Sequence, residues 1–422
     1  MTQAPLLQAP VSLEKTEACR FRFDLFTLPA MLPQCHILSG EQLYLVRVHP
    51  GMDAIEAQQW NRLVDADLPF LRHEFLAAME HHGCVGQHLG WIPRHLGLYD
   101  AAGLLLAAAP GYIKFNSYGE LVFDWSWADA YRRHGLAYYP KLVVASPYTP
   151  ATGTRILTGD HPQREELASA LIRGALEIAA QMEVSSLHWL FTSEIEQHWL
   201  CRAGLLARLG CQFHWHNRGY ASFDDFLAEF TAEKRKKLNR ERRRVREAGI
   251  EFRWLMGGEV TEEEWSIFHR LYRSTFDKRG GLATLTLGFF REIGRLMGEN
   301  LLLVFAYHGS QPLAAAFNLV GRKTLYGRHW GADGDYHSLH FETCYYQGLE
   351  YCIRHRLEGF EPGAQGEHKL SRGFLPTPTY SAHWIAHTGF RHAIGRFLEE
   401  ESAYMNEYMA GLAAHTPYRR VD

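Results

Sequence analysis

The chain has 422 residues, of which 46% are hydrophobic and 22% charged, and its formal net charge is −3. This length allows two domains with full cores, and the near-neutral balance gives no global case for a nucleic-acid partner. Three features lead us to expect a soluble cytoplasmic protein without a membrane span. The seven cysteines form no CxxC pair, the first residues, MTQAPLLQAP, do not have the pattern of a secretory signal, and no apolar run reaches the ~20 residues of a membrane helix.

The first half of the chain predicts alternating strands and helices. Residues 104–115 are apolar and interrupted at Pro110, which is typical of a strand with a kink or bulge. Residues 141–148 indicate a second strand, and residues 165–182 have apolar side chains at helical spacing. The remaining expected elements are a buried strand over 185–191, a helix over 196–210 closed by Gly210, and a short strand over 211–217.

The second half repeats this plan. Short turns connect three apolar stretches, 301–309, 312–321 and 323–332, and predict antiparallel hairpins. A helix over 340–356 and the strand-like LEGFEPG follow. The recurrence predicts an α/β (α+β) fold of two related domains, each with a mixed, largely antiparallel sheet flanked by helices. The expected domain ranges are 20–218 and 219–415.

A basic strip opens the second half. Residues 234–246 (KRKKLNRERRRVR) contain nine lysines or arginines and one acid, and the rest of the chain keeps 35 basic and 46 acidic residues, a net charge of −11. Lys236, Arg240 and Arg243 fall on one helical stripe, which favours a phosphate backbone or an acidic partner. The alternative is a solvated charged helix that pairs with acids of its own chain.

Two stretches of the first half contain candidate binding residues. NSYGELVFDW places Glu120 and Asp124 four residues apart, so that they either hold a substrate amine or form a solvated turn pair. CQFHWHN sets His214 and His216 on one strand face. Because a metal would need a further ligand, we predict no metal site and assign His214 to substrate binding. A third stretch, PYTPATGTR (147–155), suits a phosphate or is a structural loop.

The start of the expected helix in the second half, HSLHFETCYY, contains two more candidates. Glu342 stands at the start of this helix, beside the three-strand meander, and is a candidate general base or substrate clamp. It shares a helix face with Tyr346. His340 is a candidate for substrate binding. The alternative for Glu342 is an acid that only complements the helix dipole.

The stretch EPGAQGEHKLSRGF (361–374) concentrates polar side chains among three glycines. Glycines let backbone amides approach a ligand closely and form anion-binding nests. A carboxylate here can accept an amine proton, a histidine can relay it, and the two cations suit phosphate or carboxylate. The alternative is a polar turn held by internal hydrogen bonds. The candidates are Glu361, Glu367 and His368 for catalysis and Gln365, Lys369 and Arg372 for substrate binding.

Long blocks of the chain resemble one known family. The basic helix KRKKLNRERRRVREAGIEF precedes FHRLYRSTFDKRG, the meander and GAQGEHKLSRGF. The first half contains HHGCVGQHLGWIPRHL, SYGELVFDWSWADAY, YYPKLVVASPYTPATGTRIL and SSLHWLF. Over roughly residues 65–400, this order resembles the FemAB-like family of peptidoglycan biosynthesis or recognition, within the GNAT acyltransferase superfamily. The resemblance implies two tandem GNAT-like domains.

The resemblance also implies a reaction. Relatives of the Fem type transfer amino acids from aminoacyl-tRNA, so we expect an N-acyltransferase that acts on an amine of a cell-wall precursor, peptide or small molecule. Direct attack needs a base, oxyanion donors and close positioning, and the chain lacks the GxSxG motif of a covalent route. No tightly bound cofactor is expected; the donor is aminoacyl-tRNA or acyl-CoA.

Two alternatives remain. The first is an acyl-CoA-dependent N-acetyltransferase. RRHGLA (132–137) fits the letters of the pyrophosphate loop [Q/R]xxGx[G/A], but it precedes an expected strand rather than a helix. The second is a binding module for peptidoglycan fragments or nucleic acid that has kept the fold without catalysis.

Overall fold

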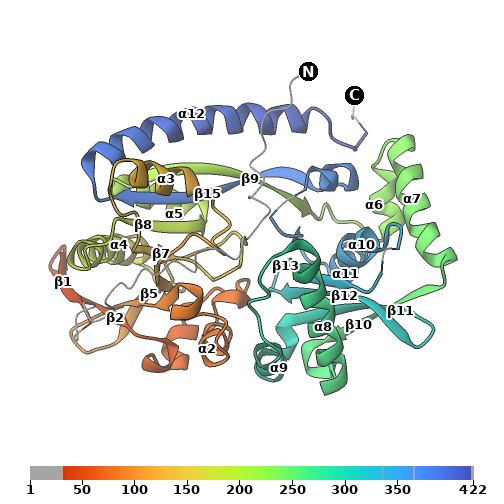
Figure 1. Cartoon of the computed structure of the whole chain (residues 1–422), viewed down its shortest axis with the longest axis horizontal. Helices are drawn as coiled ribbons and strands as arrows, with labels where there is room; N and C mark the ends of the chain where they lie inside the picture. The colour runs from red at the N-terminus through yellow and green to blue at the C-terminus, as the bar shows by residue number, and fades with distance from the viewer. Residues whose placement is uncertain (1–31, 335, 365, 420–422) are drawn as a thin grey trace.

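The computed structural model describes residues 32–334, 336–364 and 366–419. Its strands form two sheets flanked by helices (Figure 1). The smaller sheet has the order β1-β2-β4-β5 and is antiparallel throughout. Its strands are β1 (Gln34–Ser39), β2 (Gln42–His49), β4 (His95–Tyr99) and β5 (Leu105–Ala109).

The larger sheet runs through both halves of the chain in the order β10-β11-β12-β13-β14-β9-β15-β8-β7-β6-β3. Only two of its pairs are parallel, β7 with β8 and β13 with β14. Its strands are β3 (Trp91–Pro93), β6 (Gly111–Lys114), β7 (Lys141–Val144), β8 (Ser186–Thr192), β9 (Leu206–His216), β10 (Ile250–Met256), β11 (Leu301–His308), β12 (Gln311–Val320), β13 (Thr324–Ala332), β14 (Gly359–Glu361) and β15 (Leu375–Ile385).

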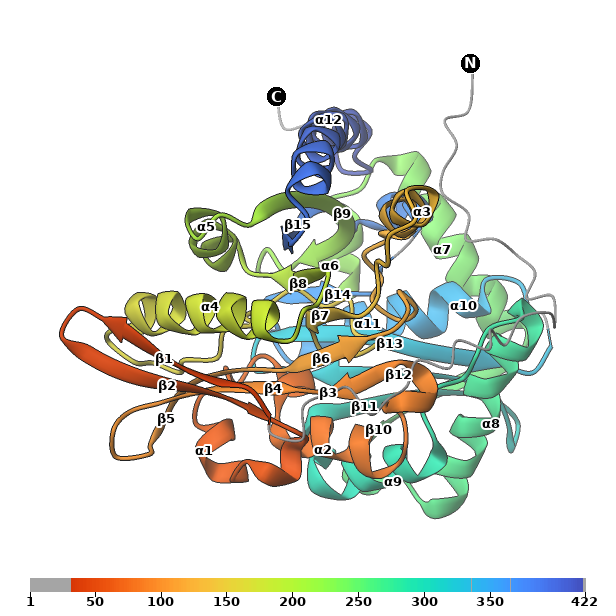
Figure 2. The same cartoon turned by 60° about the vertical axis from the view of Figure 1, so that its left-hand side comes forward.

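Each parallel pair is joined by helical chain, so the repeated plan expected from the sequence is present. In the first half α4 (Arg164–Gln181) connects β7 to β8 and packs against the smaller sheet (Figure 2). In the second half α10 (Leu339–Phe341), the π-helical turn η7 (Glu342–Tyr346) and α11 (Gln347–Arg354) connect β13 to β14. Parallel strands require such crossovers, whereas short turns join the antiparallel pairs β1–β2, β4–β5, β11–β12 and β12–β13.

The two halves exchange strands at the centre of the larger sheet. β9 belongs to the first half by sequence but pairs with β14, and β15 belongs to the second half but pairs with β8. The long helix α12 (Thr388–Ala413) lies over β9 and β15 (Figure 1). The division at residue 218 therefore stays a prediction, because one continuous sheet crosses it.

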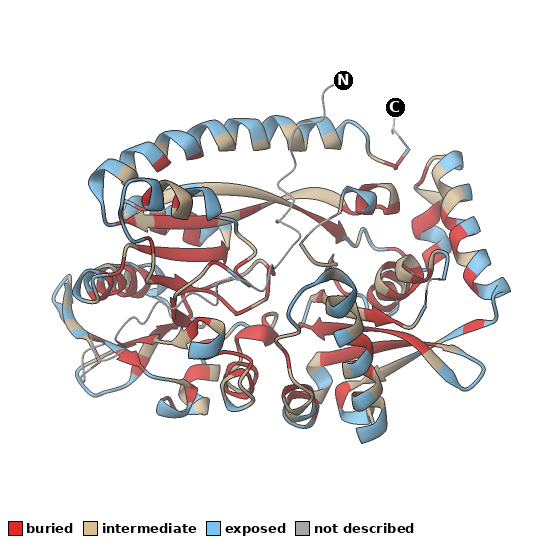
Figure 3. Ribbon diagram, viewed as in Figure 1, coloured by how far each residue is buried: buried red, intermediate tan, exposed pale blue. Residues whose placement is uncertain are grey.

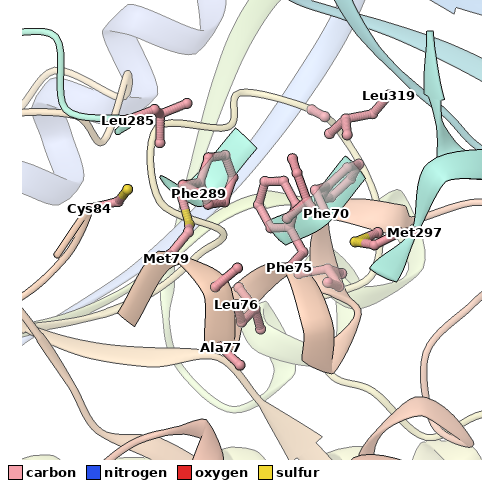
Figure 4. Packing of buried hydrophobic residues seen from close by; sticks show 14 of the residues in the cluster. Phe70, Phe75, Leu76, Ala77, Met79, Cys84, Leu285, Phe289, Met297 and Leu319 are labelled. Carbon is pink, nitrogen blue, oxygen red and sulfur yellow. The ribbon is translucent and has the colours of Figure 1, made fainter. Parts of the chain in front are cut away.

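The remaining helices cover the sheets, and buried residues concentrate in the strands beneath them (Figure 3). One apolar core joins the halves: Phe75 and Phe289 meet edge to face, with ring centroids 5.4 Å apart (Figure 4). These helices include α2 (His73–His81), α3 (Trp125–Arg133), α5 (Glu194–Arg202), α6 (Phe223–Ala228), α7 (Ala232–Glu247), α8 (Glu262–Arg279) and α9 (Leu287–Leu296).

Local details test the sequence predictions. The break at Pro110 is confirmed, because β5 ends and β6 begins on either side of it; a Cβ on Gly111 would lie 2.3 Å from the Arg94 carbonyl oxygen. The predicted end of the helix over 196–210 is wrong, because α5 already ends at Arg202. The chain turns at Gly204 with φ +88°, and Gly210 lies inside β9 opposite Thr379. Cross-strand pairing has overridden the usual role of glycine as a helix end.

Candidate functional site

A half-buried polar junction forms where the loop between β7 and α4 meets the end of β14. The backbone N–H of Thr152 donates to Glu361 Oε2 at 3.1 Å, and His214 Nδ1 lies 3.8 Å from Glu361 Oε1. The Arg328 guanidinium donates to the Tyr148 carbonyl oxygen. We call Tyr148, Thr152, His214, Arg328 and Glu361 the junction site; it joins four separate segments of the chain.

The sheet topology explains this meeting. β13 and β14 pair only as far as Tyr326 and Glu361, after which β13 continues to Ala332 without β14. β9 flanks β14 on its other side, with Trp215 opposite Phe360, so the next residue toward the splayed end is His214. The strand exchange therefore brings a histidine of the first half beside a carboxylate of the second.

Other polar groups hold the loop over 147–155 in place. Gln212 donates through Nε2 to the Pro150 carbonyl oxygen at 2.8 Å, and its Oε1 lies 3.0 Å from His214 Nε2. The buried Arg155 guanidinium donates to the Ala151 carbonyl oxygen at 2.6 Å. The loop reaches the junction site with most of its polar groups already paired, as a preorganised site requires.

Burial tunes the junction site toward proton transfer near neutral pH. It raises the pKa of Glu361 to about 8, against the opposing effects of the Thr152 N–H and Arg155. Burial, together with His216, lowers the pKa of His214 to about 3, so His214 is neutral at pH 7. Burial also lowers the pKa of Arg328 to about 10. A carboxyl that titrates near pH 8 can take a proton from an attacking amine.

The space beside the junction site is small. A cavity of about 10 Å³, roughly room for one water molecule, lies against Tyr148 and Arg328. Apolar side chains of both halves line it, among them Phe75, Met79 and Phe289 (Figure 4). Thr152, His214 and Glu361 do not line this cavity.

The stretch 361–374 only partly follows the prediction. Residues Glu367–Arg372 form the 3-10 helix η8. Lys369 is buried, its ammonium donates to the Gly363 carbonyl oxygen at 2.6 Å, and burial lowers its pKa to about 8. Glu367 lies at the surface and accepts from the Tyr408 hydroxyl at 2.6 Å. Internal bonds therefore tie the segment down, as the alternative proposed, while Glu361 reaches the junction site. Gln365 lies outside the described residues.

His340 and His368, predicted from separate stretches, come together. Their ring centroids are 6.3 Å apart, and His368 Nε2 lies 2.9 Å from the Tyr345 hydroxyl. The His340 ring also packs against Trp330, at 4.6 Å between centroids. The cluster lies where η8 faces η7, and its predicted role in substrate binding and proton relay stays a prediction.

Glu342 faces the basic helix rather than the junction site. Its carboxylate accepts from the Arg242 guanidinium at 2.9 Å, and Arg242 also reaches Glu350 at 2.8 Å. Tyr346 shares this face, as expected, and its hydroxyl donates to Glu241. The group that Glu342 clamps in this structure is a guanidinium of its own chain, and its predicted role as a base stays untested.

Glu120 and Asp124 do not form a solvated turn pair. Both are buried around the ammonium of Lys141, which lies 2.8 Å from Glu120 Oε2, donates to Asp124 Oδ2 and reaches Ser117 Oγ at 2.9 Å. Burial raises the pKa of Glu120 to about 7. The amine that these carboxylates hold here belongs to the chain itself.

The predicted basic stripe lies on the outer face of α7. Lys236, Arg240 and Arg243 are exposed, whereas Leu238 and Val245 pack inward. Within the described part of the chain, no ion pair forms with Lys236 or Arg240, and Arg243 has only an exposed partner. The stripe is therefore available to an anionic partner.

Sequence reasoning missed several residues of these sites. Arg328 lies between two glycines in the half-buried strand β13. A charged residue at such a position could have indicated a polar site. Arg155 and Thr152 belong to PYTPATGTR, which had been marked as a possible phosphate loop. Lys141 gave no signal beyond its place at the start of a strand.

Two features are absent from the described residues. Among them, no group of three or more His, Cys, Asp or Glu side chains is placed to hold a metal ion. No helix within the same ranges combines the length and apolarity needed to cross a membrane.

A family model named FemAB-like and described as peptidoglycan biosynthesis/recognition matches residues 51–420. No curated protein sequence matches the chain. Among solved structures, FemX is similar at 12% identity with a TM-score of 0.51, over 81% of this chain and 98% of FemX. This likeness shows the fold, and the two sheets flanked by helices, with the strand order of one half repeated in the other, confirm the expected α/β class.

Two further structures are similar with lower scores. The C-terminal domain of a putative lysylphosphatidylglycerol synthetase from Agrobacterium fabrum has a TM-score of 0.47 at 12% identity, over 83% of this chain and 96% of that domain. A tandem GNAT protein from the clavulanic acid biosynthesis pathway has a TM-score of 0.41 at 10% identity, over 81% and 99%.

Proposed function

Because the chain belongs to the FemAB-like family of peptidoglycan biosynthesis or recognition, we propose that it is an N-acyltransferase acting on an amine of a peptidoglycan precursor or a related peptide. The observation that carries the proposal is Glu361, a half-buried carboxyl with a pKa of about 8 at the splayed end of β13 and β14. Such a group can accept the proton of an amine that attacks an acyl donor.

The other groups of the junction site have matching roles in this proposal. The Arg328 guanidinium, which donates to the Tyr148 carbonyl oxygen in this structure, is a donor that can stabilise the oxyanion of the tetrahedral intermediate. His214 is neutral at pH 7 and its Nδ1 lies 3.8 Å from Glu361 Oε1, so it neither hydrogen-bonds to Glu361 nor competes with it for the proton. No group of the chain needs to carry the acyl group, so the transfer is direct.

Substrate consumption tests the proposal. Purified protein is incubated separately with labelled aminoacyl-tRNA and labelled acyl-CoA, each with a panel of amines that includes a peptidoglycan precursor. We expect transfer of label to the precursor amine from one donor. Binding of a peptidoglycan fragment without consumption of either donor contradicts transfer and supports a recognition module.

Aminoacyl-tRNA is the donor that the exposed stripe of α7 favours. Reversing Lys236, Arg240 and Arg243 to glutamate is expected to remove tRNA binding and to lower the slope of log K against log salt by roughly 2 to 3, since each phosphate contact contributes about 0.7 to 0.9. Gel shifts at several salt concentrations measure this.

The matched control reverses Arg132, Arg202 and Arg218, which are exposed on other elements. Equal loss of tRNA binding in both triple variants indicates a nonspecific charge effect. No shift of the unaltered protein at low salt excludes tRNA and leaves acyl-CoA as the donor to test.

A further inference from the structure

The inner face of α7 contains the only acid of the basic strip. Glu241 is 7% exposed and lies between the buried residues Leu238 and Val245, three positions before it and four after it. This spacing places the three side chains on one face of the helix. The face turns toward η7 and η8, so the carboxylate is directed away from the basic stripe.

Both oxygens of Glu241 are occupied. Arg372 Nη2 donates to Oε1 at 2.8 Å and to Oε2 at 3.0 Å, and the Tyr346 hydroxyl donates to Oε2. Arg372 is 3% exposed and lies 3.4 Å above the ring of Phe341. Its second terminal nitrogen donates to the His368 carbonyl oxygen at 2.7 Å. A continuous chain of contacts thus runs from α7 through Arg372 to the backbone of η8.

η8 depends on such contacts for its position. A six-residue 3-10 helix has weak hydrogen-bond geometry and few backbone bonds of its own. At its other side Lys369 is tied to Gly363, within the same segment. Without Glu241 the Arg372 guanidinium would be a buried charge without a counter-charge, which is strongly unfavourable. The carboxylate therefore decides whether Arg372 stays in place.

We propose that Glu241 is a positioning residue that, through Arg372, holds η8 and, through the bond between Lys369 and Gly363, the segment that follows Glu361. The consequence for catalysis rests on the acyl-transfer function proposed above, whereas the positioning itself does not. The basic helix then has two faces with separate tasks: the outer one for an anionic partner and the inner one for η8.

Hydrogen exchange tests the positioning. In Glu241→Gln we expect the amides of 361–374 to exchange at least about tenfold faster, because Arg372 loses its counter-charge and η8 opens more often. Hydrogen exchange measures such a local opening independently of the rest of the fold. The amides of α4 should not change. Glu247→Gln is the matched control, since Glu247 lies on the same helix with its side chain 66% exposed. Glu241→Gln combined with Arg372→Met should exchange more slowly than the two single effects predict, because neither charge is left unpaired.

Enzyme kinetics supply the second readout. Glu241→Gln should lower kcat at least about tenfold with little change in KM of the donor, as expected for displaced groups near the reaction. Exchange of 361–374 that stays within twofold of the unaltered protein overturns the proposal, and so does equal acceleration over the whole chain. If no donor is consumed, the transfer function fails while the exchange result still decides the role of Glu241.

Discussion

Replacing Glu361 by glutamine is expected to lower the rate constant of amine acylation by about 10²- to 10⁴-fold, the usual effect of losing a general base. Glutamine keeps the size of the side chain and an oxygen that can accept from the Thr152 N–H. It cannot accept a proton. Single-turnover assays with the donor identified above and saturating acceptor measure the rate of transfer directly.

The pH profile gives a second signature of the same residue. Glu361 must be ionised to act as the base, and its pKa is about 8, so activity should rise from pH 6 to pH 9 and level off above. An acceptor whose own amine has a pKa well below 6 removes the titration of the substrate. The glutamine variant should lack the rise, and a variant that keeps it shows that another group is the base.

Stability separates this loss from misfolding. A carboxyl with a raised pKa binds its proton more tightly in the folded state, so it contributes stability below the pKa of the unfolded chain and loses it as pH rises toward 8. Glutamine resembles the protonated form at every pH. Glu361→Gln should therefore be at least as stable as the unaltered protein at pH 8, as measured by urea unfolding. Activity within about tenfold of normal in this folded variant contradicts the assignment.

The sequence located Glu361 because local features mark it: a short strand, then proline and glycine, then a polar stretch. It named His214 and the stretch 147–155 as separate candidates, but it did not show that either lies beside Glu361. His214 comes from a strand of the other half, and Thr152 from a loop more than 200 residues away in the chain. Hydrophobic periodicity reports which face of an element is buried, not which distant element covers it. For that reason the sequence did not predict the exchange of β9 and β15 between the halves.

The charge pattern of the sequence also did not show which charged side chains of the basic helix face inward. The strip over 234–246 predicted a basic helix, and the helix is present, but Glu241 and Arg242 turn inward and bind η8 and η7. A helical wheel centred on Leu238 and Val245 would have indicated this, since Glu241 falls between them. The carboxylates Glu120 and Asp124 were predicted to hold a substrate amine or to form a solvated turn pair, whereas in this structure they hold an amine of the chain itself. That the amine is Lys141 depends on a tertiary contact.

Replacing Lys141 by methionine is expected to lower the free energy of unfolding by about 3–5 kcal/mol, the range found when one partner of a buried ion pair is removed. Lys141 is fully buried, and its ammonium is shared by Glu120, Asp124 and Ser117. Methionine fills similar space but leaves two carboxylates without their cation. Chemical denaturation at pH 7.5 measures the loss.

The dependence on pH distinguishes lost charge pairing from lost packing. In the unaltered protein Lys141 holds the pKa of Asp124 low, and the stability gained in this way is present above the unfolded pKa and lost in acid. In Lys141→Met both carboxylates instead bind protons more tightly when folded, so the variant gains stability as pH falls. The deficit should therefore be largest at pH 7 to 8 and shrink toward pH 5.

Two further variants complete the test. Lys323→Met removes an exposed lysine that lies 3.1 Å from Glu358, and should change stability by no more than about 1 kcal/mol. Adding Glu120→Gln and Asp124→Asn to Lys141→Met removes the unpaired charges and should recover part of the loss, because the remaining groups can hydrogen-bond as neutral amides. A deficit that is the same at pH 5 and pH 8, or that the two amides deepen, means that Lys141 acts through its packed methylene chain, and the ion cluster is then incidental to the stability of the first half.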